Sequence, residues 1–393
     1  MRKLVVVILT AIFIGTIVYT FVGKYNEKEQ KSILLAMSYI KNNTMPNGRF
    51  VYRKHVNSKL RLKYQNKKYN ALRHAGALYS MYLCERFLKD SSLRKQRLIA
   101  SDYFVKNYIR RVNNDQYAVV SKPEEEGVKD DGTAKLGGAG LALISLSNLY
   151  PEKRIDKQVL TGLGKFIVSM QKPDGNYAPM YLVHENVIDT FSLSLYYPGE
   201  AALGLLNLNE VLPDKKWVLS AKRALIYLSQ KRKDLGINVE FDHWAMLATW
   251  KLFSMKENTL SNDERLLLEK HAEQMANSII YQQNMDKTNA YYGSLKGNIR
   301  PCSIGTKMEG LVAIYQIIDN ETLRVKVLKS IEAMNIFLEN AQIKEGHAEG
   351  GLPTSADWNT INAKKNADIV QIDNVQHVLS AWILYHIFIA KDY

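Results

Sequence analysis

The feature that most constrains the fold is an alternation, repeated six times from residue 28 onward, between two kinds of helical segment. One kind is amphipathic and charged. In the segment 154–171, for example, Val159, Leu163 and Phe166 recur at helical spacing on one face. The other kind is apolar on most faces and rich in Gly and Ala. A helix that is apolar on most faces is typically buried, and small residues allow neighbouring helices to approach closely.

The charged segments lie at about 28–43, 92–110, 154–171, 215–231, 262–283 and 321–341, and the apolar segments begin at 72, 136, 197, 241, 306 and 373. Helix pairs of this kind bury a shared core only when they stack on one another. We therefore predict an all-α chain with an (α/α)6 toroid, in which six outer helices surround a barrel of six inner helices. Residues 25–393 form one domain in this prediction.

The N-terminus predicts a membrane anchor. Residues 4–22 carry no charge, follow Arg2 and Lys3, and are long enough to span a bilayer. No cleavage site of small residues follows them, and the flanking positive charges favour a cytoplasmic N-terminus. We therefore expect residues 1–24 to hold one transmembrane helix that anchors an extracytoplasmic domain in the cell membrane. A cleaved signal peptide is the alternative, and it also predicts export.

The charge balance favours anionic partners. The net charge is +14, and residues 53–68 hold seven Lys or Arg and no acid. Acidic glycans and lipid headgroups fit this balance, whereas no zinc-finger spacing or aromatic–basic signature supports nucleic acid. Cys84 and Cys302 are the two cysteines, and their spacing permits one disulfide but does not require it. They form no CxxC pair, so we expect no cysteine-based structural zinc, and we predict no metal and no cofactor. The oligomeric state stays open.

Loop lengths indicate which end of the toroid carries a site. The connections from a charged segment to the next apolar one are long at about 44–69, 111–135, 172–196, 285–305 and 342–372, and short only near 232–239. In an up-and-down ring these loops emerge on one face, where the inner helices also begin. Long loops on a rigid scaffold usually carry function.

Polar residues gather where the apolar segments begin. The candidates for catalysis are Glu200, Asp242, Glu309 and Asp373, and those for substrate binding are Arg73, His74, Asp131, Tyr197, His243, Trp244 and His377. Helix capping competes as an explanation for each single carboxylate, and Thr306 to Glu309 has the pattern of a capping box. Capping does not explain the histidines and Arg73 at equivalent helix starts, so the joint pattern favours a ligand site.

The stretch GKFIVSMQKPDGNYAP, residues 164–179, resembles the helix-end turn Q-x-x-D-G-x-aromatic of several α/α-toroid families, and residues 47–50 resemble a weaker copy. Through its periodicity the chain resembles the α/α-toroid superfamily, which includes six-hairpin glycosidases, polysaccharide lyases, sugar epimerases and terpenoid cyclases. The D-x-D-D element of the alkene-protonating cyclases is absent, since only Asp130 and Asp131 are adjacent.

The toroid, its carboxylates and its 23 tyrosines predict a glycan-active enzyme, with a polysaccharide or oligosaccharide as its partner. Aromatic rings can stack on sugar faces and donate hydrogen bonds to sugar hydroxyls. We expect a glycoside hydrolase that acts on an envelope or extracellular polysaccharide. Cleavage of a glycosidic bond requires one protonated carboxyl group and one carboxylate. We expect Glu200 to be the general acid, because burial beside Tyr197 raises the pKa of a carboxyl group, and Asp242 to be the base.

Two other functions fit the same scaffold. In a polysaccharide lyase or uronate epimerase, His74, His243 and His377 transfer protons and Arg73 neutralises the uronate carboxylate. In a non-catalytic glycan-binding or assembly protein, the aromatic residues bind and the acids serve only as helix caps.

Overall fold

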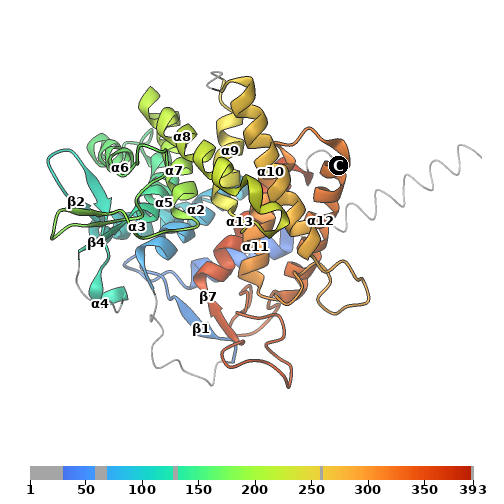
Figure 1. The fold of residues 1–393 in the computed structure, drawn as a ribbon. Coiled ribbons are helices and arrows are strands. Elements are labelled where there is room, and N and C mark those ends of the chain that lie inside the picture. Colours follow the sequence, from blue (N-terminus) through green and yellow to red (C-terminus); the bar gives the residue numbers. More distant parts are fainter. Residues whose placement is uncertain (1–29, 58–68, 127–131, 257–259, 391–393) are drawn as a thin grey trace, which may run out of the picture.

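The computed structural model of the chain describes residues 30–57, 69–126, 132–256 and 260–390 (Figure 1). Twelve long helices alternate along this part of the chain between an inner and an outer ring. The expected anchor at 4–22, together with Asp130 and Asp131, lies outside the described residues. Within the described ranges, no helix combines the length and the apolar character needed to cross a membrane.

The Gly- and Ala-rich segments form the inner ring. Its helices are α2 (Ala71–Leu88), α5 (Leu136–Leu146), α7 (Tyr197–Val211), α9 (His243–Phe253), α11 (Pro301–Tyr315) and α13 (Ile372–Phe388). Each contacts the next in this order, and α13 contacts α2, so the ring is closed. Small residues permit the spacing: a Cβ added at Gly204 of α7 would lie 2.6 Å from the carbonyl oxygen of Gly140 in α5.

The charged segments form the outer ring. A helix over residues 30–42 is followed by α3 (Ser91–Tyr108), α6 (Lys157–Ser169), α8 (Lys215–Arg232), α10 (Asn262–Gln282) and α12 (Glu321–Ala341). Asp90, Asp214 and Ser261 cap three of these helices by accepting backbone N–H groups of the first turn. The predicted alternation of six inner and six outer helices is confirmed.

The expectation of an all-α chain needs one correction, because the long loops contain three-residue strands. These are β1 (Arg53–His55), β2 (Ile109–Arg111), β3 (Tyr117–Val119), β4 (Thr133–Lys135), β5 (Met180–Leu182), β6 (Val187–Asp189) and β7 (Ile369–Gln371). They pair antiparallel as β1–β7, β2–β3 and β4–β5–β6. The loops also hold α4 (Pro123–Glu126) and a 3-10 turn at Lys233–Asn238, and a second 3-10 turn, Ser147–Leu149, follows α5.

The strand pairs tie neighbouring loops together at one end of the toroid (Figure 1). Arg53 pairs with Gln371, which joins the first long loop to the last, and Thr133 pairs with Leu182, which joins the second to the third. We call this end, where the inner helices begin, the front face. The inner helices end at the opposite end, the rear face.

The helix-end turn seen in the sequence fastens outer helix α6 to the next outer helix, α8. Gln171 and Tyr177 form a β-bridge across the turn, and Gly175 has a φ of +98°. The Gln171 side chain donates to the carbonyl oxygen of Ser220 in α8, and the Tyr177 hydroxyl lies 2.7 Å from the Ser220 hydroxyl. Equivalent bridges close the turns at Thr44–Phe50 and Gln283–Leu295.

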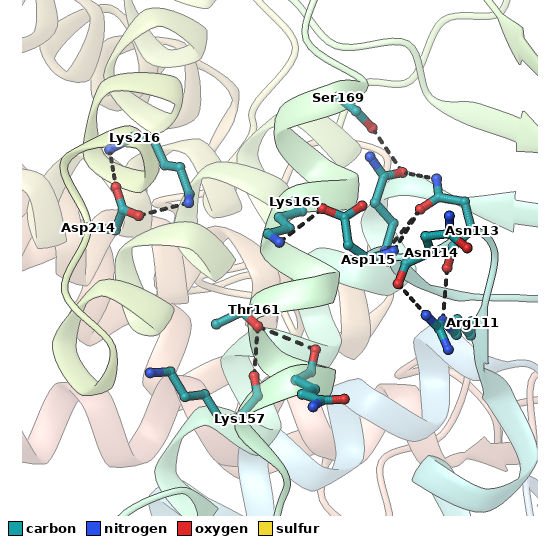
Figure 2. Close-up of polar contacts among 12 residues, drawn as sticks. Arg111, Asn113, Asn114, Asp115, Lys157, Thr161, Lys165, Ser169, Asp214 and Lys216 are labelled. Carbon is teal, nitrogen blue, oxygen red and sulfur yellow. Dashed lines mark hydrogen bonds and ion pairs between the residues drawn. The ribbon is translucent and has the colours of Figure 1, made fainter.

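Surface polar contacts position the outer elements. Lys165 of α6 pairs with Asp115 in the β2–β3 turn at 2.9 Å, and Arg111 donates to the carbonyl oxygen of Asn113 in the same turn at 3.1 Å (Figure 2). Exposed pairs of this kind contribute at most about 1 kcal/mol. The stability of the toroid therefore comes from the apolar contact between its rings.

Candidate active site

Three of the predicted site residues come together at the front face. His243 is the first residue of α9, Glu309 lies in the third turn of α11, and His377 lies in the second turn of α13. Their ligand atoms all lie within 4.8 Å of one another. His377 Nδ1 lies 2.9 Å from Glu309 Oε2, and His243 Nε2 lies 3.8 Å from the same oxygen.

Two glycines in α11 let the three helices converge. A Cβ added at Gly310 would lie 2.5 Å from the Phe241 ring and 3.1 Å from the Cα of His243. A Cβ added at Gly305 would lie 3.0 Å from the backbone nitrogen of Val378. All three distances are shorter than ordinary van der Waals contact. The absence of a side chain at these two positions therefore brings the α9 start and α13 close to α11, near Glu309.

The two histidines differ in how readily they bind a proton. Burial lowers the pKa of His243 well below its ordinary value, and the charges of His377 and Lys307 act in the same direction. Burial also opposes the charged form of His377, but the charge and hydrogen bond of Glu309 outweigh it, so the pKa of His377 is raised. At neutral pH the cluster therefore holds one neutral imidazole and one that is easily protonated.

Glu309 acts on His377 and does not cap a helix. Ser380, which lies three residues after His377 in α13, donates a hydrogen bond to Glu309 Oε1, while His377 occupies Oε2. Because α11 begins two turns earlier, at Pro301, the capping box expected from Thr306 to Glu309 does not form. The fully buried carboxylate is instead the charge partner of His377.

Aromatic rings surround the cluster. The Trp244 and Tyr196 ring centroids lie 4.7 Å and 5.5 Å from that of His243. Tyr79 of α2 lies 5.9 Å from Trp244 in turn. Trp244 is 3% exposed and Tyr196 is 36% exposed. Tyr196 is therefore the ring of this group that is most open to a ligand arriving from solvent.

An ion pair lies beside the cluster. Arg73 Nε is 3.2 Å from Asp373 Oδ2, and the Tyr52 hydroxyl is 3.4 Å from the same oxygen. The Arg73 guanidinium also lies over the Tyr52 ring, 5.3 Å from its centroid. The charge of Asp373 helps to raise the pKa of His377. The Arg73–Asp373 pair therefore contributes to the electrostatic environment of the cluster. The half-buried Arg73 side chain lies on the solvent side of the pair.

The two carboxylates predicted as acid and base are both buried. Burial, and secondly the charge of Asp242, raise the pKa of Glu200 to about 8. Asp242 is the N-cap of α9: Oδ1 accepts the Ala245 N–H at 3.1 Å, and Oδ2 accepts from Arg232 at 3.0 Å. Both carboxylate oxygens of Asp242 are therefore engaged in structural contacts. These contacts agree with the explanation of Asp242 as a helix cap and not with its predicted role as a free base.

The remaining predicted residues, His74, Tyr197 and Asp131, differ in where they lie relative to the cluster. His74 corrects an expectation, because its side chain points toward the outer ring: Nε2 lies 2.9 Å from the carbonyl oxygen of Ala100 in α3, and Nδ1 lies 2.5 Å from the Tyr69 hydroxyl. Tyr197 adjoins Glu200, and burial raises the pKa of its hydroxyl to about 12. Asp131 lies outside the described residues.

Three residues around the cluster were missed in the sequence: Tyr52, Tyr79 and Ser380. Ser380 could have been found, because a residue three positions after His377 lies on the same helix face. Tyr52 reaches Asp373 because it precedes β1, which pairs with β7 across more than 300 positions of sequence. No local pattern reveals that pairing.

His243, Glu309 and His377 are also the residues most able to hold a divalent metal, since within the described ranges they alone form a compact His/Cys/Asp/Glu group. Two ligands of one tetrahedral zinc lie about 3.3 Å apart. The 2.9 Å between His377 Nδ1 and Glu309 Oε2 is instead a direct hydrogen bond. Cys84 and Cys302 are both free.

Similarity to known proteins is found in structure and not in sequence. No family model and no curated protein matches the chain. A sugar epimerase from a ruminal bacterium superimposes with a TM-score of 0.66 at 14% identity, covering 92% of this chain and 98% of that one. The cellobiose 2-epimerase of Bacillus thermoamylovorans gives 0.63 at 14% identity, covering 92% and 98%.

An inactive variant of the α-1,6-mannanase of a Salegentibacter species, in complex with α-1,6-mannotriose, gives a TM-score of 0.58 at 11% identity, covering 92% and 99%. In that variant two consecutive aspartates are replaced by asparagine. At such identities the similarity establishes the fold alone. The expected resemblance to the α/α toroids is confirmed at that level.

Proposed function

We propose that this α/α toroid, which has the fold of the six-hairpin glycosidase-like superfamily, is a sugar epimerase or isomerase. In this reaction a proton moves at the carbon beside the carbonyl group of an open-chain sugar. The observation that carries the proposal is the pair formed by neutral His243 and readily protonated His377 around Glu309. A base and an acid beside each other are what such a proton transfer requires.

Each residue has a definite role in this reaction. His243 accepts the proton from the carbon, and His377 gives its proton to the carbonyl oxygen, so that a neutral enediol forms. Protonated His243 then returns a proton to C2 after rotation about the C2–C3 bond has presented the opposite face, which gives the epimer, or to the neighbouring carbon C1, which gives the ketose. In both cases the carbonyl group forms again as an enediol hydroxyl gives its proton back to His377. Glu309 keeps His377 protonated and oriented. The protons balance, and no oxidant or reductant takes part.

The substrate that fits best is a neutral saccharide with a free reducing end. Asp373 already neutralises Arg73, so the guanidinium is a weaker anchor for a uronate carboxylate than an unpaired one. The half-exposed Tyr196 ring suits the apolar face of a sugar. Two of the similar structures are of enzymes named as sugar epimerases, which supports this class of substrate.

A glycoside hydrolase, the leading expectation from the sequence, is the second candidate. The similar mannanase is inactive when two consecutive aspartates are replaced, and this chain has consecutive Asp130 and Asp131 before α5. The pKa of about 8 for Glu200 also suits a proton donor at neutral pH. Against this candidate, Asp242 is held by Ala245 and Arg232 and is not free to act as the second carboxylate.

Incubation with unlabelled mannose, glucose or cellobiose in deuterated water distinguishes the two reactions. We expect NMR spectroscopy to show loss of the proton signal at C2 together with formation of an epimer or ketose. His377→Asn should slow this exchange by roughly 10²-fold or more, whereas Asp131→Asn should not. Release of new reducing ends from α-1,6-mannan, abolished by Asp131→Asn and not by His377→Asn, would favour the hydrolase.

We also propose that residues 4–22 anchor the toroid in the cell membrane with the N-terminus in the cytoplasm. The uncharged run and the preceding Arg2 and Lys3 support this location. Alkaline extraction should leave the chain with the membranes, and protease added to intact cells stripped of their wall should digest the toroid. A chain released by alkali would contradict the anchor.

A further inference from the structure

A cavity of about 620 Å³ opens at the rear face of the toroid. It is lined by the middle and last turns of α2, α5, α7, α9 and α13. It opens at the other end of the barrel from His243 and Glu309 and reaches inward to Tyr79, whose ring lies 5.9 Å from that of Trp244. This volume is within the range of pockets that hold small molecules or headgroups. We call it the rear pocket. Its charged and aromatic lining includes Arg86, Lys89, Glu210, Trp250, Lys251 and Phe388.

The rear pocket combines positive charge with aromatic rings. Arg86, Lys89 and Lys251 are its cations, and Glu210, its one lining acid, pairs with Lys251 at 2.6 Å. Arg86 donates a hydrogen bond to the Tyr82 hydroxyl at 3.3 Å, a neutral partner that leaves its charge uncompensated. The Trp250 and Phe388 rings pack edge to face, with centroids 4.6 Å apart. The lining therefore carries two more positive than negative charges around an aromatic wall.

Helix stability explains only part of this arrangement. A cation in the last turn of a helix is stabilised by the helix dipole, and Arg86 and Lys251 both occupy such turns. The dipole does not require a cavity between the helix ends or rings left partly open to it. Tryptophan beside lysine and arginine is instead typical of protein surfaces at the boundary of a bilayer.

The path of the chain places the rear face on the membrane side. The outer helix over residues 30–42 leads into the first front-face loop, so it runs from the rear toward the front. The uncharged run ends at residue 22, which leaves residues 23–29 to reach the helix. Seven residues span at most about 25 Å in any conformation. The bilayer therefore lies near the end of the helix that points to the rear face.

We infer that the rear pocket binds the headgroup of an anionic phospholipid, with the rear face against the bilayer and the front face turned away from it. Arg86 and Lys89, the two lining cations that Glu210 does not pair with, contact the phosphate, and Trp250 and Phe388 contact the glycerol and upper acyl chain. This inference rests on the membrane anchoring under the proposed function and is independent of the reaction proposed there. This orientation of the toroid leaves the front face open to saccharides that arrive from the side away from the membrane.

The test compares the full-length chain in phosphatidylcholine vesicles with and without phosphatidylglycerol. We expect phosphatidylglycerol to slow backbone hydrogen exchange in segments 82–89 and 247–256 by about tenfold or more, and to leave the front-face segment 183–196 unchanged. The double variant Arg86→Gln/Lys89→Gln should lose this protection, because it removes the two cations that Glu210 does not pair with. Both side chains are exposed, so they can be replaced without disturbing the core. Lys165→Gln, which removes a cation from α6, should keep both the protection and the sugar reaction.

Two results would overturn the inference. One is equal protection in neutral and phosphatidylglycerol vesicles, or protection that survives Arg86→Gln/Lys89→Gln. The other is equal protection by inorganic phosphate or glycerol phosphate added to the chain in detergent, which would make the rear pocket a site for a soluble anion. Because proton exchange on the sugar is measured on the same samples, loss of the proposed reaction and loss of lipid binding are told apart.

Discussion

At the scale of single residues, Glu309 decides whether His377 is a proton donor. Glu309→Gln keeps the shape of the side chain but removes the charge that raises the pKa of His377. Burial is then opposed only by the charge of Asp373, so the pKa falls and the proton is lost at a lower pH. We expect the alkaline limb of the pH–rate profile to move to lower pH, with a rate loss of roughly tenfold or more at pH 7.5. Glu321→Gln, at an exposed position of α12, is the control. A profile unchanged by Glu309→Gln would contradict the assignment.

Glu200 predicts a different kind of pH dependence, in stability. An unfolded chain ionises this carboxyl group near 4.5, whereas the folded protein does so at about 8. The folded state therefore holds the proton more tightly, and the free energy of unfolding falls as pH rises through that window, by at most about 5 kcal/mol. Glu200→Gln should be less sensitive to alkali. Urea unfolding of the wild-type chain and of Glu200→Gln at pH 6 and pH 9 measures this loss of stability. If the free energy of unfolding depended on pH equally in the two proteins, the raised pKa of Glu200 would be ruled out as its cause.

The sequence indicated the place of the site residues better than their roles. His243, Glu309 and His377 could be selected because a polar residue is an exception in an otherwise apolar helix. His74 stands at an equivalent helix start, yet it contacts α3. An inner helix is buried both toward the barrel and toward the outer ring, so its pattern does not reveal which way one side chain points. Likewise, only the contacts of Asp242 and Glu309 show which carboxylate is a cap.

At the scale of elements, the turns that fasten the outer helices depend on close backbone contact. Gly293 and Gly297 lie in one loop and have φ of +88° and +75°. A Cβ at Gly293 would lie within 2 Å of the carbonyl oxygen of Ala333 in α12, whereas a Cβ at Gly297 meets nothing within 4 Å. Gly297→Ala should cost about 1 kcal/mol for the left-handed backbone alone. Gly293→Ala should cost roughly 1–3 kcal/mol more, because a packed helix must move.

Denaturant midpoints of the two glycine variants measure this difference, with the wild-type chain as reference. Equal midpoints for Gly293→Ala and Gly297→Ala would show that the turn is not fastened to α12.

Elements of different length also differed in how far the sequence revealed them. The helices were predictable because apolar spacing over 11–21 residues is a strong signal. The three-residue strands were not, because two-residue alternation needs four or more positions to be seen.

At the scale of the whole molecule, the number of repeats sets the architecture, but closure depends on contacts between distant parts of the chain. Six helix pairs predict a ring, and a consistent up-and-down path places the long loops on one face. Closure requires α13 to contact α2 and β7 to pair with β1. These contacts join the two ends of the chain, and no local sequence pattern specifies their register. The front-face cluster depends on them, since His377 is carried by α13.

Closure predicts that the toroid unfolds as one cooperative unit. Trp382 of α13 is almost fully buried, and Trp382→Ala should remove about 3–5 kcal/mol by leaving a cavity at the joint of the ring. Because every inner helix contacts two neighbours, this loss should lower the melting temperature of the whole toroid and leave a single transition. Calorimetry of the full-length chain in detergent measures both quantities, and Leu219→Ala, at an exposed position of α8, should change neither. Two transitions, of which Trp382→Ala moves only one, would show that the toroid consists of parts that unfold independently.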